Sequence, residues 1–449
     1  MSPRALVLVA AIVGAIFFAS VYLPEVGRGF VKDDAAWVAT GIASIERPAS
    51  AWTVESAGLF FRPLVALSFA VDYELHGNRA RGYGLTNLAL CLGCAAAIGL
   101  LFRQLGLDAA AAAIGVLVWA LNPHGIAMAL LWISGRTSLL MALASTLAIS
   151  SFVARRRLAG SALLLCALLA KEDAVAVPLI VVACAYAAQK LRRRDLWLDL
   201  AWMAAAEAVY FAVRLRTSAM MPSTAPWYYR LSSSPMAIAI NAASYLDRAA
   251  TGAAIVTILA FVAYRRYPRD LSRHHRRLLL TAAVWFVAGL AITVRIPVRS
   301  DLYAVFPSIG GALACAAFVD ATRRDVGLDA LRRRDARMGL ILAALLAMVP
   351  IYRARNARFA EPARVSSEVQ RLLSGDLAAL PAAGTIVLED APARFATFGD
   401  AFGGLSTSAV RLFTGRSLVA DIVEAGDAAA RPGEVARYKL AAGTVQRVR

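Results

Sequence analysis

Long apolar stretches recur along the whole chain, and short polar or basic segments separate them. Apolar stretches of this length are typical of helices that cross a membrane, whereas half-buried strands alternate between apolar and polar residues. We therefore predict an all-α polytopic membrane protein with eleven spans. They cover residues 5–23, 84–102, 109–122, 136–153, 158–170, 174–189, 196–213, 249–264, 278–294, 302–319 and 338–352.

Composition supports a membrane protein and argues against nucleic acid as a partner. Of 449 residues, 59% are hydrophobic and 17% are charged, which is more apolar surface than a soluble core can bury. The net charge is +18, but the 48 basic residues fall in runs between apolar stretches instead of on one soluble face. In such loops they orient helices and contact headgroups, so membrane lipids are the expected partners.

The basic runs predict the topology, because short loops rich in Arg and Lys lie on the cytoplasmic side. The strongest runs are 155–157, 190–194, 265–277 and 323–337. Two cytoplasmic runs must be separated by an even number of crossings. The stretch between the first two runs therefore turns on the outer side at residues 171–173, since a charge at mid-bilayer costs about 2.5–3.5 kcal/mol.

The same rule on the number of crossings places a turn at residues 122–135 on the outer face. It also makes the N-terminus, with Arg4, cytoplasmic. Eleven crossings then leave the C-terminus outside. Residues 1–23 are interpreted as a retained helix, because no small-residue cleavage site of a signal peptide follows. Several spans are shorter than about 20 residues, so the outer turns must dip into the membrane, as happens where they line a cavity.

Two larger pieces are predicted outside the membrane. The first is an outer loop at 24–83, whose apolar stretch 60–71 we place on the membrane surface. The second is the tail, in which 384–389 and 409–414 alternate like strands and indicate a small extracytoplasmic α/β domain. We divide the chain into a membrane domain at 1–352 and this tail domain at 353–449.

The first chemical candidates are Asp33 and Asp34, about ten residues beyond the first span. Adjacent carboxylates repel, so one can have a raised pKa, or both can bind a hard cation such as Mg²⁺ or Mn²⁺. Either arrangement suits a general base that deprotonates an acceptor hydroxyl. A solvated loop or a helix N-terminus is the alternative.

The other candidates lie in further segments predicted to face outward. Arg62 could bind a phosphate through its planar guanidinium, or it could extend along the apolar surface to a lipid headgroup. Lys171 is a candidate because ionisable residues in membrane segments are often functional, although an ion pair with its acidic neighbours would serve structure alone. A single histidine such as His124 more often makes ordinary hydrogen bonds within the protein than serves as a ligand. The full set is Arg62, Asn87, His124, Trp132, Arg136, Lys171, Glu172, Asp173, Arg299 and Tyr303.

Two acids and several cations thus share one side of the membrane, at the mouth of a cavity with apolar walls. This arrangement suits a reaction between an outward-facing hydroxyl and a lipid-anchored phosphate ester, in which cations stabilise the departing phosphate. The sequence contains no P-loop, no strand-based G-x-G-x-x-G and no H-E-x-x-H motif. The Cys91-x-x-Cys94 pair lies inside a predicted span without a second pair, so we interpret it as helix packing.

These segments, in this order, resemble the GT-C class of integral-membrane glycosyltransferases. They are most similar to the protein O-mannosyltransferases and to the transmembrane O-mannosyltransferases that carry tetratricopeptide repeats. The resemblance covers residues 30–310. It rests on Asp33-Asp34, Phe61-Arg62-Pro63-Leu64, Tyr83 with Thr86-Asn87, Asn122-Pro123, Trp132-Ile133-Ser134-Gly135-Arg136, Lys171-Glu172, and Tyr303 with Pro307-Ser308-Ile309-Gly310.

The resemblance implies an enzyme of the bacterial inner membrane whose active site faces the periplasm. Its donor would be a polyprenyl-phosphate-linked sugar, and transfer would be inverting. Asp33 or Asp34 would be the catalytic base. The donor phosphate would contact Arg62, Arg136, Lys171 and Arg299. The supporting residues would be Asn87, His124, Trp132, Glu172, Asp173 and Tyr303.

The chain also departs from these relatives. They often have His-Pro followed by an acidic residue, whereas Asn122-Pro123 is followed by no acid before Arg136. That leaves a divalent metal and the acceptor, whether glycan, lipid or protein, undecided. No tetratricopeptide repeats follow the last span. Three other functions stay open: a transporter or flippase for a lipid-linked or anionic substrate, a polysaccharide polymerase or ligase, and a non-catalytic scaffold.

Overall fold

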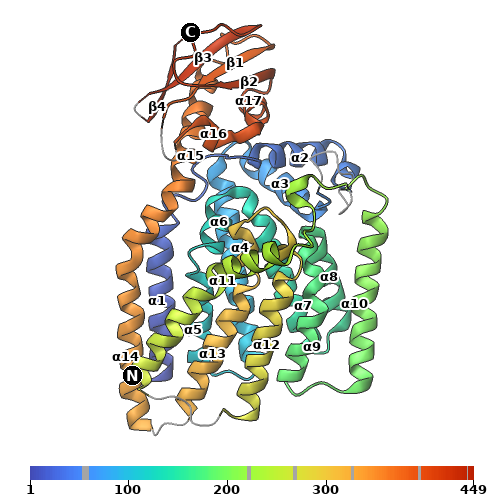
Figure 1. The fold of residues 1–449 in the computed structure, drawn as a ribbon, viewed down its shortest axis with the longest axis vertical. Helices are drawn as coiled ribbons and strands as arrows, with labels where there is room; N and C mark the ends of the chain where they lie inside the picture. The colour runs from blue at the N-terminus through green and yellow to red at the C-terminus, as the bar shows by residue number, and fades with distance from the viewer. Residues whose placement is uncertain are drawn as a thin grey trace. The chain divides into compact units, whose positions relative to one another are not determined.

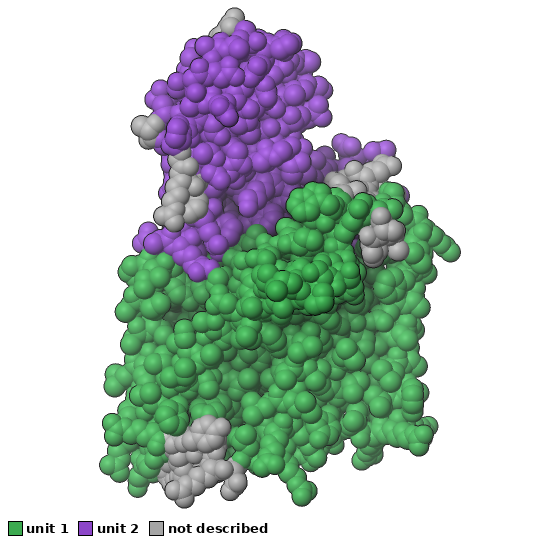
Figure 2. Space-filling model, viewed as in Figure 1, with its two compact units in different colours: residues 1–23, 89–129, 136–352 green, residues 24–88, 130–135, 353–449 purple. Residues whose placement is uncertain are grey.

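The computed structural model describes residues 1–52, 60–219, 224–265, 271–324, 328–392, 396–441 and 443–448. Parts of the basic runs at 265–277 and 323–337 lie outside these described residues. Two compact units divide the chain (Figure 2). Unit 1 holds residues 1–23, 89–129 and 136–352, and unit 2 holds residues 24–88, 130–135 and 353–449.

Unit 1 is a bundle of helices (Figure 1). Three of its helices, α4 (Ala80–Gln104), α6 (Gly125–Leu131) and α15 (Val349–Gly375), begin or end in unit 2. The others are α1 (Pro3–Val21), α5 (Ala109–Ala120), α7 (Arg136–Val153), α8 (Arg157–Ala170), α9 (Val177–Ala187), α10 (Arg193–Arg214), α11 (Pro235–Tyr264), α12 (Arg273–Leu290), α13 (Ser308–Arg324) and α14 (Leu328–Ala344). Short 3-10 turns lie at Glu172–Ala176, Trp227–Tyr229, Thr293–Arg295, Asp301–Ala304 and Leu345–Met348.

The helix boundaries follow local capping chemistry. The Asp108 carboxylate accepts from the backbone N–H of Ala111 at the start of α5, and the Ser234 hydroxyl does the same for Ala237 at the start of α11. Inside the bundle, α13 packs against α5, α11 and α12, and most of its residues are buried. Gly115 of α5 allows this approach, because a Cβ there would lie 2.9 Å from that of Ala316.

All eleven predicted apolar segments are helical, so the chain is a multi-pass membrane protein. Among the described residues, however, only seven helices are long and apolar enough to cross a membrane by themselves, or up to eight if α5 and α6, bent by 62°, form one span. The remaining predicted spans are too short or too highly charged to cross a membrane by themselves. Helices α8 and α9 have 14 and 11 residues, and the 18 residues of α12 include three arginines.

Unit 2 contains α2 (Asp34–Glu46), α3 (Pro63–His76) and a small sheet (Figure 1). The strands are β1 (Ala383–Glu389), β2 (Ser417–Val423), β3 (Glu434–Ala441) and β4 (Thr444–Arg447), in the order β2-β1-β3-β4. β1 is parallel to β2 and β3, and β4 is antiparallel to β3. The other elements are α16 (Phe398–Phe402), α17 (Ser406–Thr414) and 3-10 turns at Pro48–Trp52, Ile133–Gly135 and Gly403–Leu405.

The tail is a mixed α/β unit, but one of its two predicted strands is wrong. Residues 384–389 form the central strand β1, as expected. Residues 409–414 lie in the helix α17 instead. The buried residues Ala409, Val410, Leu412 and Phe413 follow the spacing i, i+1, i+3 and i+4, which places them on one face of a helix.

Close packing of α2 on α3 fixes the start of α2. A Cβ on Gly41 would lie 2.7 Å from the backbone nitrogen of Ala70, so only glycine fits this crossing. The rings of Trp37 and Phe69 stack with centroids 6.0 Å apart. The first turn of α2, which carries both candidate carboxylates, is therefore held on a rigid pair of helices.

Candidate active site

The first cluster of site residues lies in unit 2, where Asp33 precedes α2 and Asp34 begins it. The residue before them, Lys32, has a left-handed backbone conformation with φ of 52°. Its backbone N–H donates to the carbonyl of Ala401 at 2.6 Å. This contact within unit 2 fixes a sharp turn immediately before the two carboxylates.

Asp34 is completely buried, and protein donors occupy both of its oxygens. Oδ2 accepts from the backbone N–H of Val31 at 2.8 Å. Oδ1 accepts from the backbone N–H of Ser134 at 2.7 Å and from the Ser134 hydroxyl. Burial, and secondly the charge of Asp33, raise the pKa of Asp34 to about 7. Asp34 thus joins two distant segments and has little capacity left for a ligand.

Asp33 differs from its neighbour in one respect that matters for chemistry. Its Oδ2 accepts from the Trp37 indole at 3.3 Å, whereas its Oδ1 is buried and has no hydrogen-bond partner among the described residues. Burial raises the pKa of Asp33, while the nearby Ser134 hydroxyl, the hydrogen bond from Trp37 and the charge of Arg62 oppose the rise. Of the two carboxylates, Asp33 is the one with an oxygen left for a substrate.

Aromatic and cationic groups accompany the acids in unit 2. The Lys32 ammonium lies 5.3 Å from the ring centroid of Trp132, whose indole N–H is buried without a partner among the described residues. The Asn87 amide donates to the carbonyl of Ile133 at 2.9 Å and so holds the segment that carries Trp132 and Ser134. The Arg62 guanidinium lies 4.0 Å from the ring centroid of Phe60, directly before Pro63 starts α3.

A second cluster, in unit 1, is cationic. Lys171 lies in the predicted break between α8 and α9 and is 4% exposed. Its ammonium is 3.0 Å from Oδ2 of Asp173 and 3.2 Å from the Ser138 hydroxyl, and it lies 4.5 Å from the ring centroid of Tyr303. The ion pair considered from the sequence is therefore present, and it sits against the face of an aromatic ring.

Asp301 organises the second part of this cluster. Its Oδ1 is 3.5 Å from Nδ1 of His124 and 3.2 Å from Nε of Arg248. The Arg248 guanidinium lies over the ring of Tyr245, which packs edge-on against Tyr303, the ring that faces Lys171. A chain of aromatic contacts thus connects the two cations.

The remaining predicted residues of unit 1 are Arg299, Glu172 and Arg136. Nε of Arg299 donates to the Asn241 amide oxygen at 2.8 Å. Glu172 is half-buried beside Lys171 in sequence. Arg136, the first residue of α7, is completely buried. It lies two residues after Ser134, which binds Asp34, and two before Ser138, which binds Lys171.

Sequence reasoning missed Arg248. We predicted that its helix begins at 249, which left Arg248 in a loop, but α11 begins at Pro235 and carries Arg248 in its middle. One terminal nitrogen of Arg248 is buried without a hydrogen-bond partner among the described residues. An arginine within a 30-residue apolar helix was the available signal, because such residues are costly and usually functional.

The metal prediction concerns Asp33 and Asp34, and the contacts of the two carboxylates differ in what they leave for a metal ion. Within the ranges that the structure describes, no group of three or more His, Cys, Asp and Glu residues could hold a metal ion. Both oxygens of Asp34 already accept from N–H or O–H groups, which leaves Asp33 as the carboxylate that could contribute a ligand. A role for Mg²⁺ or Mn²⁺ stays a prediction.

Comparison with known proteins supports the predicted fold class. No protein-family model matches the chain, and no curated protein matches it. A solved structure that it matches has the GT-C glycosyltransferase fold, to which the apolar helices and the small C-terminal sheet of this chain correspond. The GT-C-like fold is thus confirmed, whereas the O-mannosyltransferase branch is not.

Two of the matching structures are of one protein, ArnT from Cupriavidus metallidurans. The crystal structure bound to undecaprenyl phosphate has a TM-score of 0.52 and 16% sequence identity, and the match covers 96% of this chain and 87% of that chain. The apo structure gives a TM-score of 0.48 and 17% identity, over 93% of this chain and 85% of that chain. At this level of identity the likeness shows the fold alone.

Proposed function

We propose that the protein is a glycosyltransferase that moves a sugar from a polyprenyl-phosphate-linked donor to an acceptor hydroxyl. The observation that carries the proposal is the buried pair of acids, in which Asp34 is tied to Ser134 while one oxygen of Asp33 stays unbonded. The fold supports the donor class, because ArnT shares it and was crystallised with undecaprenyl phosphate.

Asp33 acts as the general base in this proposal. A base works best when its pKa lies near the operating pH, and burial raises the pKa of Asp33 in that direction. The acceptor hydroxyl gives its proton to Oδ1 of Asp33 as its oxygen attacks the anomeric carbon. Asp34 is a positioning residue, since its bonds to Val31 and Ser134 fix the turn that presents Asp33.

The cations of unit 1 bind the donor phosphate and stabilise it as it leaves. In the single displacement, the bond between the anomeric carbon and the phosphate oxygen breaks as the new glycosidic bond forms, so the anomeric configuration inverts. The phosphate leaves with both electrons of that bond, and fixed positive charges lower the energy of this state. Lys171, Arg136, Arg248 and Arg299 are the proposed phosphate ligands, and Arg62 is a further candidate in unit 2.

We place the active site on the extracytoplasmic side of a bacterial inner membrane. The support is the charge pattern, because the basic runs mark the opposite ends of the same helices as cytoplasmic. The acceptor is a glycan, a lipid or a protein that presents a hydroxyl on that side. The His124–Asp301 and Asn87–Ile133 contacts are given supporting roles, since they hold Arg248 and Trp132 in place.

Transfer from defined donors tests the proposal. The purified protein in proteoliposomes is supplied with polyprenyl-phosphate sugars that carry a radiolabelled sugar, together with an extract of cell-envelope acceptors. Sugar moved to an acceptor, with release of polyprenyl phosphate, is expected from the wild type and from Glu46→Gln, a matched exposed acid at the other end of α2. It is lost in Asp33→Asn. Movement of intact donor across the bilayer without transfer would instead identify a flippase.

A further inference from the structure

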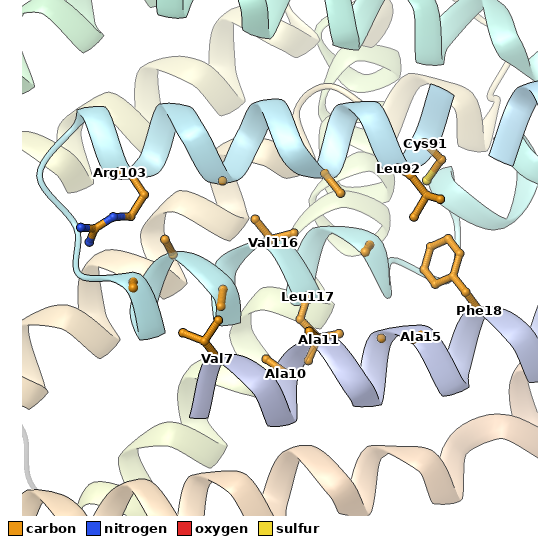
Figure 3. A pocket seen from close by; sticks show the side chains of 17 residues that line it. Val7, Ala10, Ala11, Ala15, Phe18, Cys91, Leu92, Arg103, Val116 and Leu117 are labelled. Carbon is orange, nitrogen blue, oxygen red and sulfur yellow. The ribbon is translucent and has the colours of Figure 1, made fainter. Parts of the chain in front are cut away.

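A cavity of about 600 Å³ lies among α1, α4 and α5 of unit 1 (Figure 3), and none of the residues that line it belongs to the proposed active site. This volume is within the range of about 300–1,000 Å³ typical of ligand pockets. Its walls are apolar and built mainly from small side chains. Among these small residues are Ala10 and Gly14 of α1, Gly99 of α4, and Ala109, Ala113 and Ala120 of α5.

The cavity has one charged end. Arg103, in the last turn of α4, lines it at the end where α5 begins, whereas Cys91 and Phe18 lie at the other end (Figure 3). The Arg103 side chain is exposed and donates to the carbonyl of Leu107 at 2.5 Å. It has no carboxylate partner in the part of the chain that the structure describes.

The length of the cavity indicates which kind of lipid chain it can hold. The lining runs along α5 from Ala109 to Ala120, which is about 17 Å at 1.5 Å per residue. Half of a hydrocarbon core about 30 Å thick is about 15 Å. The slot thus fits one acyl chain from one leaflet, and it is too short for a polyprenyl chain that continues beyond that leaflet.

The charged end also indicates which leaflet supplies the chain. The turn after Arg103 contacts the basic run at the end of α13, where Arg324 donates to the carbonyl of Gly106 and Arg323 pairs with Asp108. Basic runs mark the cytoplasmic side, whose leaflet is rich in anionic lipids. We infer that this cavity binds one acyl chain of an anionic phospholipid, with the lipid phosphate on Arg103.

Lipid retention measured by native mass spectrometry tests the inference. The protein is purified in mild detergent and incubated with equal amounts of phosphatidylglycerol and phosphatidylethanolamine. The wild type should retain one phosphatidylglycerol per chain, and Arg103→Gln should lower its occupancy about five-fold, as loss of one interfacial cation predicts. Arg273→Gln, an exposed arginine that does not line the cavity, is the matched control.

Filling the cavity provides an independent test. Ala113→Phe places a ring in the slot and should abolish retention, whereas Ala96→Phe, on an exposed position of α4 outside the lining, should leave it unchanged. Equal retention in Ala113→Phe and the wild type would overturn the inference. So would equal retention of the two phospholipids, or displacement of phosphatidylglycerol by an equimolar amount of undecaprenyl phosphate, which would make the polyprenyl carrier the occupant. The outcome does not depend on whether the protein transfers sugar.

Discussion

Ser134 donates both its backbone N–H and its hydroxyl to one oxygen of Asp34, a residue one hundred positions earlier in the chain. This double hydrogen bond joins the first loop after α1 to the segment that precedes α7. It also separates the roles of two adjacent acids, because it occupies Asp34 and leaves an oxygen of Asp33 without a partner among the described residues.

The two acids should respond differently to the same substitution. Asp33→Asn removes the proposed base and should lower the transfer rate about 10²–10⁴-fold with little effect on folding. Asp34→Asn should mainly destabilise unit 2, by about 1–3 kcal/mol, because an amide cannot accept from three donors as the carboxylate does. Transfer assays and thermal unfolding distinguish the two. A fully active Asp33→Asn protein would end the base assignment.

Stability should fall as the pH rises from about 4 to about 7. The pKa of Asp34 is raised from 3.8 when unfolded to about 7 when folded, so the folded state holds this proton more tightly. The contribution is fully present below pH 4 and is lost as the pH passes 7. Denaturant unfolding at a series of pH values measures this slope. In Asp34→Asn the slope should be smaller, and an unchanged slope would exclude Asp34 as its source.

Transfer should increase with pH as the proposed base, Asp33, loses its proton, and because burial raises the pKa of Asp33, the increase should begin at a higher pH than for an exposed aspartate. Ser134→Ala removes a donor that lowers the pKa of both acids, so it should shift the rise in activity to higher pH. Ser44→Ala, which removes a buried hydroxyl of α2 that donates to the Thr40 carbonyl, is the control and should leave the profile in place. A profile of Ser134→Ala identical to that of the wild type would argue against this coupling.

The cations of unit 1 should affect the donor more than the acceptor. Arg136→Ala and Lys171→Met are expected to raise the KM for the donor at least ten-fold, since each removes a fixed charge from the proposed phosphate site. Because Arg136 is buried, Arg136→Lys is included to separate loss of charge from loss of packing. Steady-state kinetics with both substrates varied decide the matter, and equal changes in the two KM values would contradict a phosphate role.

The same kinetic test applies to Arg248, which became a candidate only from the tertiary structure. Arg248→Gln should weaken donor use, and Arg248→Lys should restore part of it if the charge is what matters. Asp247→Asn, an exposed acid next to it on α11, is the matched control. Unchanged donor kinetics in Arg248→Gln would reduce Arg248 to a structural partner of Asp301.

Cysteine labelling from each side of the membrane tests the topology. Lys32→Cys should react with a membrane-impermeant maleimide from the extracytoplasmic side, and Arg156→Cys only from the cytoplasmic side. Both positions are exposed, whereas four of the five native cysteines are buried; the fifth, Cys166, is replaced by Ser in the background protein. Labelling of both variants from the same side would overturn the predicted sidedness and, with it, the outward-facing site.

The sequence by itself determined the membrane class, the helical nature of all eleven apolar segments and the break at Lys171. These features depend on neighbouring residues, because the cost of burying a charge or an unpaired backbone group in lipid acts within one segment. It also singled out Asp33 and Asp34, but not their separate roles. Those depend on Ser134, and a hydrogen bond between residues one hundred positions apart leaves no local pattern.

Only the tertiary structure decided the remaining points. Arg248 became a site residue because α11 begins at Pro235 and brings it to Asp301. Residues 409–414 became a helix because a short apolar run suits either a strand or a helix until its buried face is known. The cavity beside Arg103 is likewise invisible in sequence, since small residues on α1, α4 and α5 leave a space only once the three helices pack together.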